Sequence, residues 1–247
     1  MKRRLLIDGD ILIYKIATQN EVDTHWGDGM WTLHCDENIC KAHVDNTIEN
    51  LMSDLEADAF MIALTDKNNF RKDVLPSYKH NRKSKRKPMV LNSLKEYVIN
   101  KYKAKIFKNL EADDVLGIFA TSPHNEERII VSVDKDLNQI PTLVSDGKTI
   151  RKVSKEHANY FFMVQALSGD AGDGYTGLPQ CGIKTAHKLL GDNINVPLLD
   201  LWKKVLSAYT NKGYSEKEAL QQARVAKILT YKEYNRKTGE VLLWQGV

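Results

Sequence analysis

The stretch LLIDGD, residues 5–10, is a short apolar run that leads directly into a carboxylate, Asp8. The same arrangement recurs in MIALTD, which ends at Asp66, and in IIVSVDKD, which ends with Asp134 and Asp136. Short continuous apolar runs are typical of strands that are buried on both faces of a sheet. Since open α/β sheets bind their ligands at the carboxyl ends of the strands, this pattern predicts an acidic site at that edge.

The pattern around these runs predicts the fold class. Candidate strands cover residues 5–8, 59–65, 104–107, 129–133 and 142–145. Helical patterns lie between them, around residues 44–55 and 94–102, and such alternation is typical of an α/β fold with a mainly parallel sheet flanked by helices. The segment Trp26–Trp31 has the turn residues of a hairpin. Beyond about residue 150 the strand signal fades, so we expect an α/β region over residues 1–150 and a helical region over 151–247.

Two further acidic segments complete the set. LEADD contributes Glu111, Asp113 and Asp114, and SGDAGD contributes Asp170 and Asp173. An acid in the first turn of a helix can simply complement the helix dipole, which would account for any single residue of LEADD. Nine carboxylates gathered by one fold would instead repel one another, and a divalent cation would be needed to offset their charge. The whole set therefore favours a metal-dependent phosphoryl-transfer enzyme.

Composition narrows the class of protein. The 247 residues, 42% of them hydrophobic and 28% charged, suffice for one large domain or two smaller ones. No apolar run reaches the length of a membrane span, and Asp8 and Asp10 interrupt the run that opens the chain, so we expect neither a membrane contact nor a signal peptide. The odd and sparse set of three cysteines suits a reducing compartment. We therefore expect a cytoplasmic protein.

A zinc site is the alternative for part of the chain. His34, Cys35, Cys40 and His43 could supply ligands, but the Cys-x4-Cys spacing is loose for a structural zinc. We expect instead that Cys35 ends a strand and that Cys40 faces the core.

The net charge of +4 hides a basic run of six side chains: Lys79, Arg82, Lys83, Lys85, Arg86 and Lys87. Without these six the chain would carry a net charge of −2. Such a run is often only a solvated segment. Beside so many acids it suits an enzyme that acts on a polyanion, because the acids would hold metal at the reacting phosphate while the bases hold neighbouring phosphates.

The motifs occur in the order LLIDGD, TDKNNFRKDVLPSYKHNRKSKRKP, LEADDVLGIFA, IIVSVDKDLNQIP and SGDAGDGYTGLPQCGIKTAHKLL. In this order, from residue 5 to about 190, the chain resembles the flap-endonuclease and 5′→3′ exonuclease superfamily, most closely the replication exonucleases of short-tailed phages. The resemblance implies a PIN-like nuclease core over residues 1–150, with a basic arch at about 67–95. It also implies a helix-three-turn-helix region over 151–247 that grips duplex DNA.

The resemblance further implies two magnesium ions, for which Mn²⁺ could substitute. The first site of the family falls on Asp8, Asp66, Glu111 and Asp113, and the second on Asp134, Asp136, Asp170 and Asp173, with Asp114 between the two. Asp10 corresponds to a variable position and is expected to cap a helix or to support the ligands.

Basic and aromatic residues of the arch also correspond to the family. Lys79 and Arg82 match two catalytic bases that face the scissile phosphate. Tyr78 could stack on a base, although packing is the commoner role, and Arg71 is a weaker candidate for a phosphate contact. The bases that are expected to bind neighbouring phosphates are Lys83, Lys85, Arg86 and Lys87.

The duplex-gripping hairpin of the family corresponds to residues 177–186. Gly177 and Gly182 would let the backbone approach a phosphate, and Lys184 would contact it. Gln180 replaces a glycine of the family pattern, which puts the turn of the hairpin in question, and with it the K⁺ ion that the family often binds there.

The implied function is a magnesium-dependent 5′→3′ exonuclease that acts on 5′ ends of duplex DNA, on RNA in RNA–DNA hybrids and, as a weaker prediction, on flaps. Its role would be phage DNA replication, primer removal and DNA degradation, in the host cytoplasm. Two alternatives remain. LLIDGDIL also resembles the nucleophile motif of haloacid-dehalogenase phosphatases, and a non-catalytic DNA-binding protein would need only the basic run and the glycine hairpin.

Overall fold

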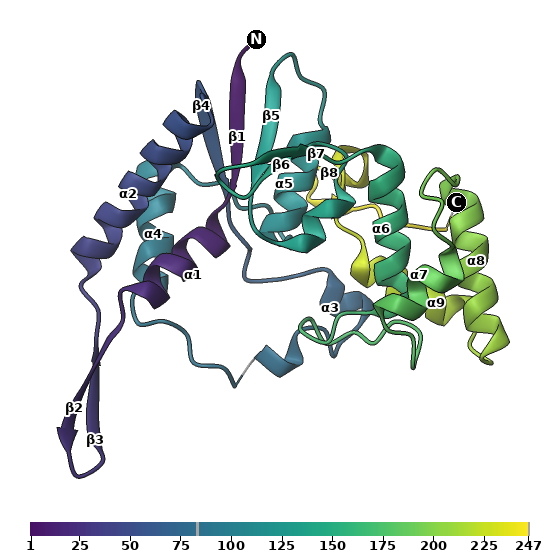
Figure 1. Ribbon diagram of the computed structural model, residues 1–247, viewed down its shortest axis with the longest axis horizontal. Coiled ribbons are helices and arrows are strands. Elements are labelled where there is room, and N and C mark those ends of the chain that lie inside the picture. The colour runs from purple at the N-terminus through teal and green to yellow at the C-terminus, as the bar shows by residue number, and fades with distance from the viewer. Residues whose placement is uncertain (83, 247) are drawn as a thin grey trace.

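The computed structural model describes residues 1–82 and 84–246 and contains a mixed sheet covered by helices, followed by a group of helices (Figure 1). The strands of the sheet are β1 (Arg3–Asp8), β4 (Ala59–Ala63), β5 (Glu127–Val131), β6 (Leu143–Ser145) and β7 (Ile150–Lys152). They lie in the order β4-β1-β5-β6-β7, in which the first four are parallel and β7 pairs antiparallel with β6. The predicted α/β class is confirmed.

One expected strand is not formed. The prediction of a strand over residues 104–107 is wrong, because this segment makes a single bridge, between Lys105 and Ala63 at the edge of β4. The Lys105 N–H donates to the Ile62 carbonyl at 2.7 Å, and the chain then turns so that the Leu110 N–H donates to the Phe107 carbonyl at 3.2 Å. An apolar run at the rim of a sheet can thus be buried without extending the ladder.

Helices cover both faces of the sheet. On one face lie α1 (Gly9–Gln19), α2 (Glu37–Asp54) and α4 (Leu91–Tyr102), and on the other lies α5 (Ala112–Thr121). Successive side chains of β1 alternate between the two faces, so Leu5 and Ile7 pack with α1, α2 and α4, whereas Leu6 packs with α5. This alternation explains why the run that opens the chain is apolar throughout.

The helical region has a core of its own. It consists of α6 (Lys155–Ser168), α7 (Ile183–Leu190), α8 (Leu198–Asn211) and α9 (Glu216–Ala226). These helices pack around fully buried side chains such as Met163 and Tyr209. After α9 the chain returns to the sheet, where Ile228 and Leu229 are buried against the α5 side of the core. The division near residue 150 stays a prediction, since Ile228, Leu229 and Tyr234 lie beyond residue 150 but belong to the core of the sheet.

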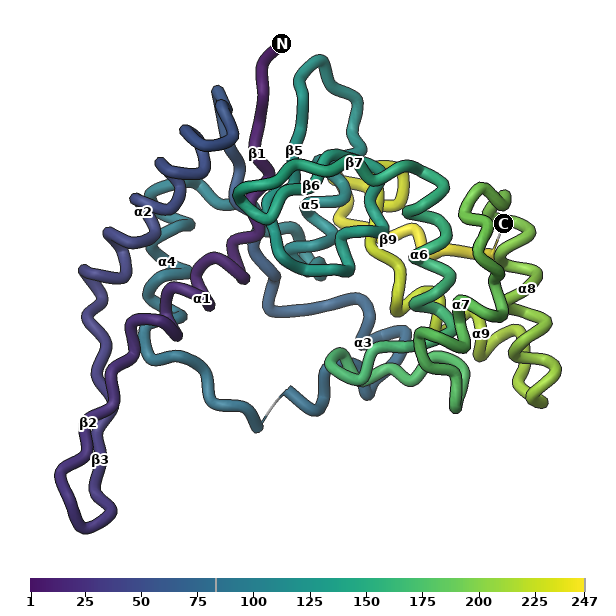
Figure 2. Tube along the Cα trace, viewed as in Figure 1, coloured from purple at the N-terminus to yellow at the C-terminus, as the bar shows by residue number. Residues whose placement is uncertain are grey.

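Short elements complete the fold. They are β2 (Val22–Gly27), β3 (Met30–His34), α3 (Arg71–Val74), β8 (Tyr234–Asn235), β9 (Glu240–Val241) and the 3₁₀ turns His80–Arg82, Lys135–Gln139 and Tyr231–Glu233. The predicted hairpin at Trp26–Trp31 is confirmed as β2–β3, which projects from the body of the molecule (Figure 2). In the part of the chain that the structure describes, no helix combines the length and the apolar character needed to cross a membrane.

Candidate active site

The carboxyl ends of β1 and β5 meet the start of α5 and the loop after α6 around one hollow of about 260 Å³. Carboxylates from four separate segments line it: Asp8, Asp10, Glu111, Asp113, Asp134, Asp136, Asp170 and Asp173. Three cationic side chains share the lining, namely Lys79, Arg82 and Lys135. The fold therefore brings together residues that lie up to 165 positions apart in the chain.

Asp8 is placed by the junction of β1 and α1. Its Oδ1 caps α1 by accepting from the Ile11 N–H at 3.1 Å, and its Oδ2 accepts from the Ser132 hydroxyl at 2.9 Å. The next residue must be glycine, because a Cβ at Gly9 would lie 2.5 Å from the Ile62 side chain and 2.6 Å from the Ala63 carbonyl oxygen. The LLIDGD motif thus combines an acid at a strand end with the close approach of α1 to β4.

Three carboxyl groups of the hollow have raised pKa values. Burial raises the pKa of Asp8 to about 6, with the charges of Asp10 and Asp134 adding to the shift. Burial and the neighbouring Asp134 raise the pKa of Asp136 to about 6, and the pKa of Asp113 is raised well above its ordinary value by burial and by Asp8. The protein itself thus compensates the ionised forms of these three groups only in part. This all-oxygen donor set, short of positive charge, fits a divalent cation of the magnesium type.

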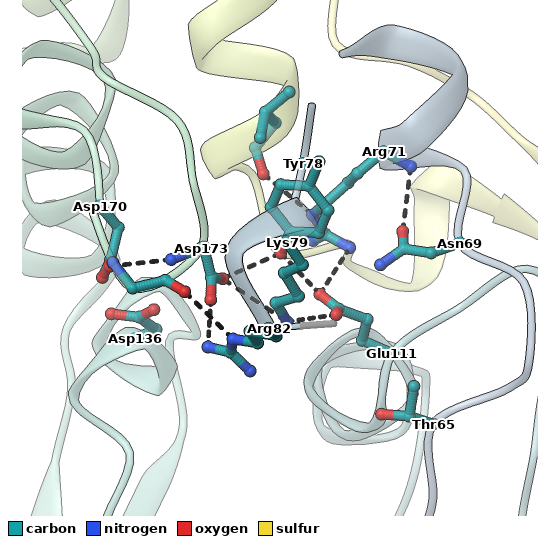
Figure 3. Close-up of polar contacts among 12 residues, drawn as sticks. Thr65, Asn69, Arg71, Tyr78, Lys79, Arg82, Glu111, Asp136, Asp170 and Asp173 are labelled. Atoms are coloured by element: carbon teal, nitrogen blue, oxygen red, sulfur yellow. Dashed lines mark hydrogen bonds and ion pairs between the residues drawn. The ribbon is translucent and has the colours of Figure 1, made fainter. Parts of the chain in front are cut away.

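Side chains of the basic arch reach the acids of the hollow, and Figure 3 shows Tyr78, Lys79 and Arg82 with Glu111 on one side and Asp173 on the other. Lys79 pairs with Glu111, and Arg82 pairs with Asp173. The Tyr78 hydroxyl lies 2.9 Å from both Glu111 Oε2 and Asp173 Oδ2. Burial would raise the pKa of Glu111, but the charges of Lys79 and Arg71 outweigh it and lower that pKa to about 2. Glu111 and Asp173 are therefore the carboxylates of the hollow that the arch supplies with counter-charges.

The backbone fixes the arch against the loop that carries Asp170 and Asp173. The Lys79 N–H donates to the Asp173 carbonyl at 2.7 Å, and the Asn81 amide donates to the Ala171 carbonyl at 2.8 Å. Lys79 adopts a φ of +55°, a left-handed conformation that a side chain disfavours. This strained residue lies where the arch turns toward the acids, which is where such conformations are commonly retained.

Two of the nine predicted metal ligands lie outside the hollow. Asp66 accepts from the Asn109 N–H at 2.9 Å and so holds the loop that precedes α5. Asp114 is fully buried and makes a two-pronged ion pair with Arg71, with N···O distances of 2.6 and 2.8 Å. Asp114 also accepts from the Leu229 N–H at 3.1 Å. In this conformation both acids have structural partners instead of facing the hollow.

Two predicted DNA contacts are buried as well. Arg71 is 2% exposed and donates to the carbonyls of Val225 and Lys227 at 2.9 and 2.7 Å. Tyr78 is 3% exposed and packs in the core of the helical region. Neither side chain is placed to meet DNA, and the packing role considered for Tyr78 is the one observed.

Sequence reasoning missed several residues that support the acids. Lys135, between Asp134 and Asp136, lies 3.4 Å from Asp170, and its position within VDKD could have drawn attention to it. Thr65 donates its backbone N–H to Asp10 at 2.9 Å. The Gln165 amide donates to Asp136 Oδ1 at 2.7 Å from the last turn of α6, where no sequence motif marked it.

The remaining arch bases lie at the surface. Lys85 and Lys87 are exposed, whereas Arg86 donates to both carboxylate oxygens of Glu21, at 2.8 and 2.5 Å. Lys83 lies outside the described residues. Within the described chain, Lys85 and Lys87 therefore have no ion-pair partner, and their side chains are open to solvent.

The hairpin at residues 177–186 keeps its tight turn despite Gln180, which adopts a φ of +60°. Gly177 is required, because a Cβ there would lie 2.3 Å from the Gly169 backbone nitrogen. Gly182 caps the start of α7, and Lys184 is exposed in its first turn. The Lys212 ammonium donates to the Pro179 carbonyl at 2.6 Å, so a hairpin carbonyl already has a cationic partner.

A preformed metal cage is not seen. Across residues 1–82 and 84–246, no three His, Cys, Asp or Glu side chains converge closely enough to hold an ion without movement or bridging water.

Cys35 and Cys40 contact each other, with their sulfurs 3.4 Å apart, and Cys40 is buried in the core.

Comparison with known proteins assigns this fold and site to a family of nucleases. The chain belongs to that family, since the family model described as "5'-3' exonuclease, N-terminal resolvase-like domain" matches residues 3–165. Along most of its length the chain is similar to the exodeoxyribonuclease of Enterobacteria phage T3, with 28% identity over 97% of this chain and 92% of the relative. The exonuclease of Escherichia phage T7 is 26% identical over 98% of this chain and 93% of the relative. The flap endonuclease Xni of Shewanella oneidensis is 28% identical over 68% of this chain and 67% of its own.

Solved structures share the fold. The crystal structure of a bacteriophage T5 protein co-crystallised with metal ions superposes on this structure with a TM-score of 0.64 at 15% sequence identity. The superposition covers 92% of this chain and 90% of the T5 chain. A T5 flap endonuclease in complex with DNA and metal ions gives a TM-score of 0.66 at 16% sequence identity, with 92% of this chain and 89% of that chain covered. The predicted succession of an α/β core and a helical C-terminal region is therefore the fold of this family.

Proposed function

We propose that the protein is a magnesium-dependent 5′→3′ exonuclease that hydrolyses phosphodiester bonds from the 5′ ends of duplex DNA. The observation that carries this proposal is the convergence of eight carboxylates and three bases on one hollow. Its support among relatives is the exodeoxyribonuclease of phage T3 and a T5 flap endonuclease that was crystallised with DNA and metal ions.

The carboxylates would hold two divalent ions, Mg²⁺ or Mn²⁺ in its place. Asp8, Glu111 and Asp113 would hold one ion, and Asp134, Asp136, Asp170 and Asp173 would hold the other; all seven line the hollow. When bound, two such ions lower the pKa of an attacking water and stabilise the entering and leaving oxygens. Asp66 and Asp114 have no part in this assignment.

Lys79 and Arg82 would bind and orient the reacting phosphate. Both side chains lie at the hollow and now pair with Glu111 and Asp173. If ions neutralise those carboxylates, the two bases become free to contact phosphate oxygens. Their positive charges would then stabilise the charge that develops in the transition state.

The rest of the substrate would be held by contacts away from the reacting bond. Lys85 and Lys87 would bind phosphates beside the arch, and Arg86 could join them by leaving Glu21. Lys184, with the backbone at Gly177 and Gly182, would bind the duplex. K⁺ at the hairpin is a lesser part of the proposal, because Lys212 already donates to a carbonyl there.

The same site would accept RNA in RNA–DNA hybrids and 5′ flaps, since phosphate contacts carry no base sequence. Such an activity suits primer removal and DNA degradation during phage replication in the host cytoplasm. The similarity to the exodeoxyribonuclease of phage T3 supports DNA as a substrate, and the similarity to flap endonuclease Xni supports flaps.

The test is incubation of 5′-labelled duplex with and without magnesium. We expect labelled nucleotides to be released in the presence of Mg²⁺ only, and Asp134→Asn to abolish release while DNA binding is retained or strengthened. A matched control is Asp200→Asn, which removes an exposed carboxylate of α8 that pairs with Lys203. Release of inorganic phosphate would instead indicate a phosphatase, and binding without cleavage a DNA-binding protein.

A further inference from the structure

Two buried glutamines connect the end of the chain to the hollow. Gln139 lies at the end of the 3₁₀ turn that begins after Asp134, and Gln165 lies in α6. They are 4% and 5% exposed, respectively. We infer that Gln139 and Gln165 form a hydrogen-bonded relay that positions the Asp136 carboxylate, and that the backbone of residues 226–228 sets the orientation of this relay. The inference rests on the proposed function in assigning Asp136 to ion binding.

The relay consists of consecutive hydrogen bonds. The Ile228 N–H donates to Gln139 Oε1 at 3.1 Å, and Gln139 Nε2 donates to the Ala226 carbonyl at 2.7 Å. Gln139 Nε2 also donates to Gln165 Oε1. Gln165 Nε2 in turn donates to Asp136 Oδ1 at 2.7 Å. The bonds join three segments that are remote in the sequence.

The backbone groups at the start of the relay leave only one orientation for both amides. A backbone N–H can only donate and a backbone carbonyl can only accept, so Gln139 must present its oxygen to Ile228 and its NH₂ group to Ala226. The second N–H of that NH₂ group then faces Gln165 and requires an acceptor there. Gln165 must therefore present its oxygen to Gln139, which leaves its NH₂ group directed at Asp136. A buried amide in the opposite orientation would leave polar groups unpaired.

The segment that sets this orientation is itself held firmly. Ile228 and Leu229 are buried in the core beside α5. The close approach of the backbone requires Gly117, because a Cβ at that position would lie 2.4 Å from the Leu229 carbonyl oxygen. The segment also lies beyond residue 165, where the match to the family model ends. A part of the chain outside the matched region thus acts on a carboxylate within it.

The consequence for Asp136 is a fixed carboxylate. The Gln165 amide holds Oδ1, and the backbone N–H of Asp136 donates to Asp134 Oδ1 at 2.8 Å. With one oxygen held by a donor, the orientation of the whole carboxylate is fixed at the hollow that Asp136 lines. Hydrogen-bond donors to metal-binding carboxylates typically change metal affinity or activity by about 10- to 100-fold when they are removed. Gln139 and Gln165 are thus positioning residues, since neither would touch the ion or the DNA.

The experiment measures ion binding without DNA. Mn²⁺ alone is titrated calorimetrically into the metal-free full-length protein and into Gln165→Leu, which fills the buried position with an apolar side chain and removes the donor to Asp136. We expect Gln165→Leu to weaken Mn²⁺ binding by about 10- to 100-fold. The Mg²⁺ concentration for half-maximal cleavage should rise by a similar factor. A merely structural role would alter thermal unfolding but not the affinity of the folded protein for Mn²⁺.

A second variant tests the orientation itself. Gln139→Glu removes the NH₂ group of residue 139, so the Gln165 amide should reverse and present its oxygen to Asp136. We expect weaker Mn²⁺ binding although residue 139 does not touch Asp136. The control is Gln221→Leu, which removes another side-chain amide, one that donates to the Val74 carbonyl at 2.8 Å on the far side of α9. Its Mn²⁺ affinity should equal that of the wild type.

The outcomes separate the relay from the proposed function. Wild-type Mn²⁺ affinity in folded Gln165→Leu overturns the relay, whether or not Gln139→Glu folds, and leaves the exonuclease proposal standing. Weakened binding in Gln165→Leu together with a wild-type protein that does not cleave DNA supports the relay and overturns the exonuclease proposal. Absence of Mn²⁺ binding by the wild type at millimolar ion overturns both.

Discussion

Asp114→Asn should destabilise the protein strongly while leaving ion binding intact. Asp114 is fully buried and is held 2.6 and 2.8 Å from the Arg71 guanidinium, which is itself 2% exposed. Asp114 also accepts from the backbone N–H groups of Glu111 and Leu229, at 3.2 and 3.1 Å. The substitution to asparagine removes the negative charge, and Arg71 is left with Glu111 as its counter-charge, 3.4 Å away and shared with Lys79.

The expected magnitude follows from this geometry. Removing one partner of a buried ion pair costs about 3–5 kcal/mol. The asparagine oxygen can still accept one of the backbone N–H bonds, so we expect a loss near the lower end, about 3 kcal/mol in the free energy of unfolding. For a chain of this size, that corresponds to a fall of about 6–12 °C in Tm. Such a loss is a large part of the total stability of a typical domain, about 5–15 kcal/mol.

The comparison variant is Asp134→Asn, which removes the same charge from the hollow. Asp134 lies among like charges and raises the pKa values of Asp8, Asp113 and Asp136. Without metal, its neutralisation should therefore leave the free energy of unfolding unchanged or raise it. With metal, it should weaken ion binding, which Asp114→Asn should not.

The assay is urea unfolding in a chelating buffer, followed by circular dichroism, with Mn²⁺ titration of the folded proteins. Equal slopes of free energy against urea are needed for the comparison. If Asp114→Asn unfolds at the wild-type urea concentration and no longer binds Mn²⁺, Asp114 is a metal ligand and the structural role assigned to it is wrong.

Three further predictions concern the hollow and the DNA-binding residues. Lys79→Ala should lower the single-turnover rate at saturating DNA by about 100-fold. The double variant Lys85→Ser with Lys87→Ser should instead weaken DNA binding and flatten the salt dependence of binding, by about 0.7–0.9 in log–log slope for each phosphate that is no longer neutralised. The reverse pattern would show that the roles are exchanged. Lys184→Ala should weaken binding to long duplexes more than to short single strands in a titration by fluorescence anisotropy, and an equal loss would place Lys184 away from the duplex. Asp8 has a pKa of about 6 in the folded protein, above its ordinary value, so protonation of Asp8 stabilises the metal-free protein. This contribution to the free energy of unfolding is fully present below pH 4 and is lost as the pH rises through 6. The free energy of unfolding should therefore fall by about 1 kcal/mol from pH 5 to pH 7 through this group, and an Asp8→Asn protein with an unchanged pH slope would contradict it.

Much of the fold could be predicted because burial on both faces of a parallel sheet leaves a direct trace in the sequence. The runs that became β1, β4, β5 and β6 are continuous and apolar, and the expected hairpin β2–β3 carries its turn residues. The run at 104–107 has the same composition but lies at the rim beyond β4. Composition shows that a segment is buried, but it does not show whether the neighbouring strand has room for a full ladder.

The sequence by itself determined the edge of the sheet where the acids gather, because the end of an apolar run is a local property of the chain. Only the tertiary structure decided which acids remain at that edge. Asp113 and Asp114 are neighbours in LEADD, yet a helix directs them to different sides, so Asp113 faces the hollow and Asp114 meets Arg71. Likewise, Gln165 holds Asp136 only because α6 packs against the turn that carries it. The partner of a polar side chain depends on which distant segment is folded beside it, and no local pattern in the sequence records that.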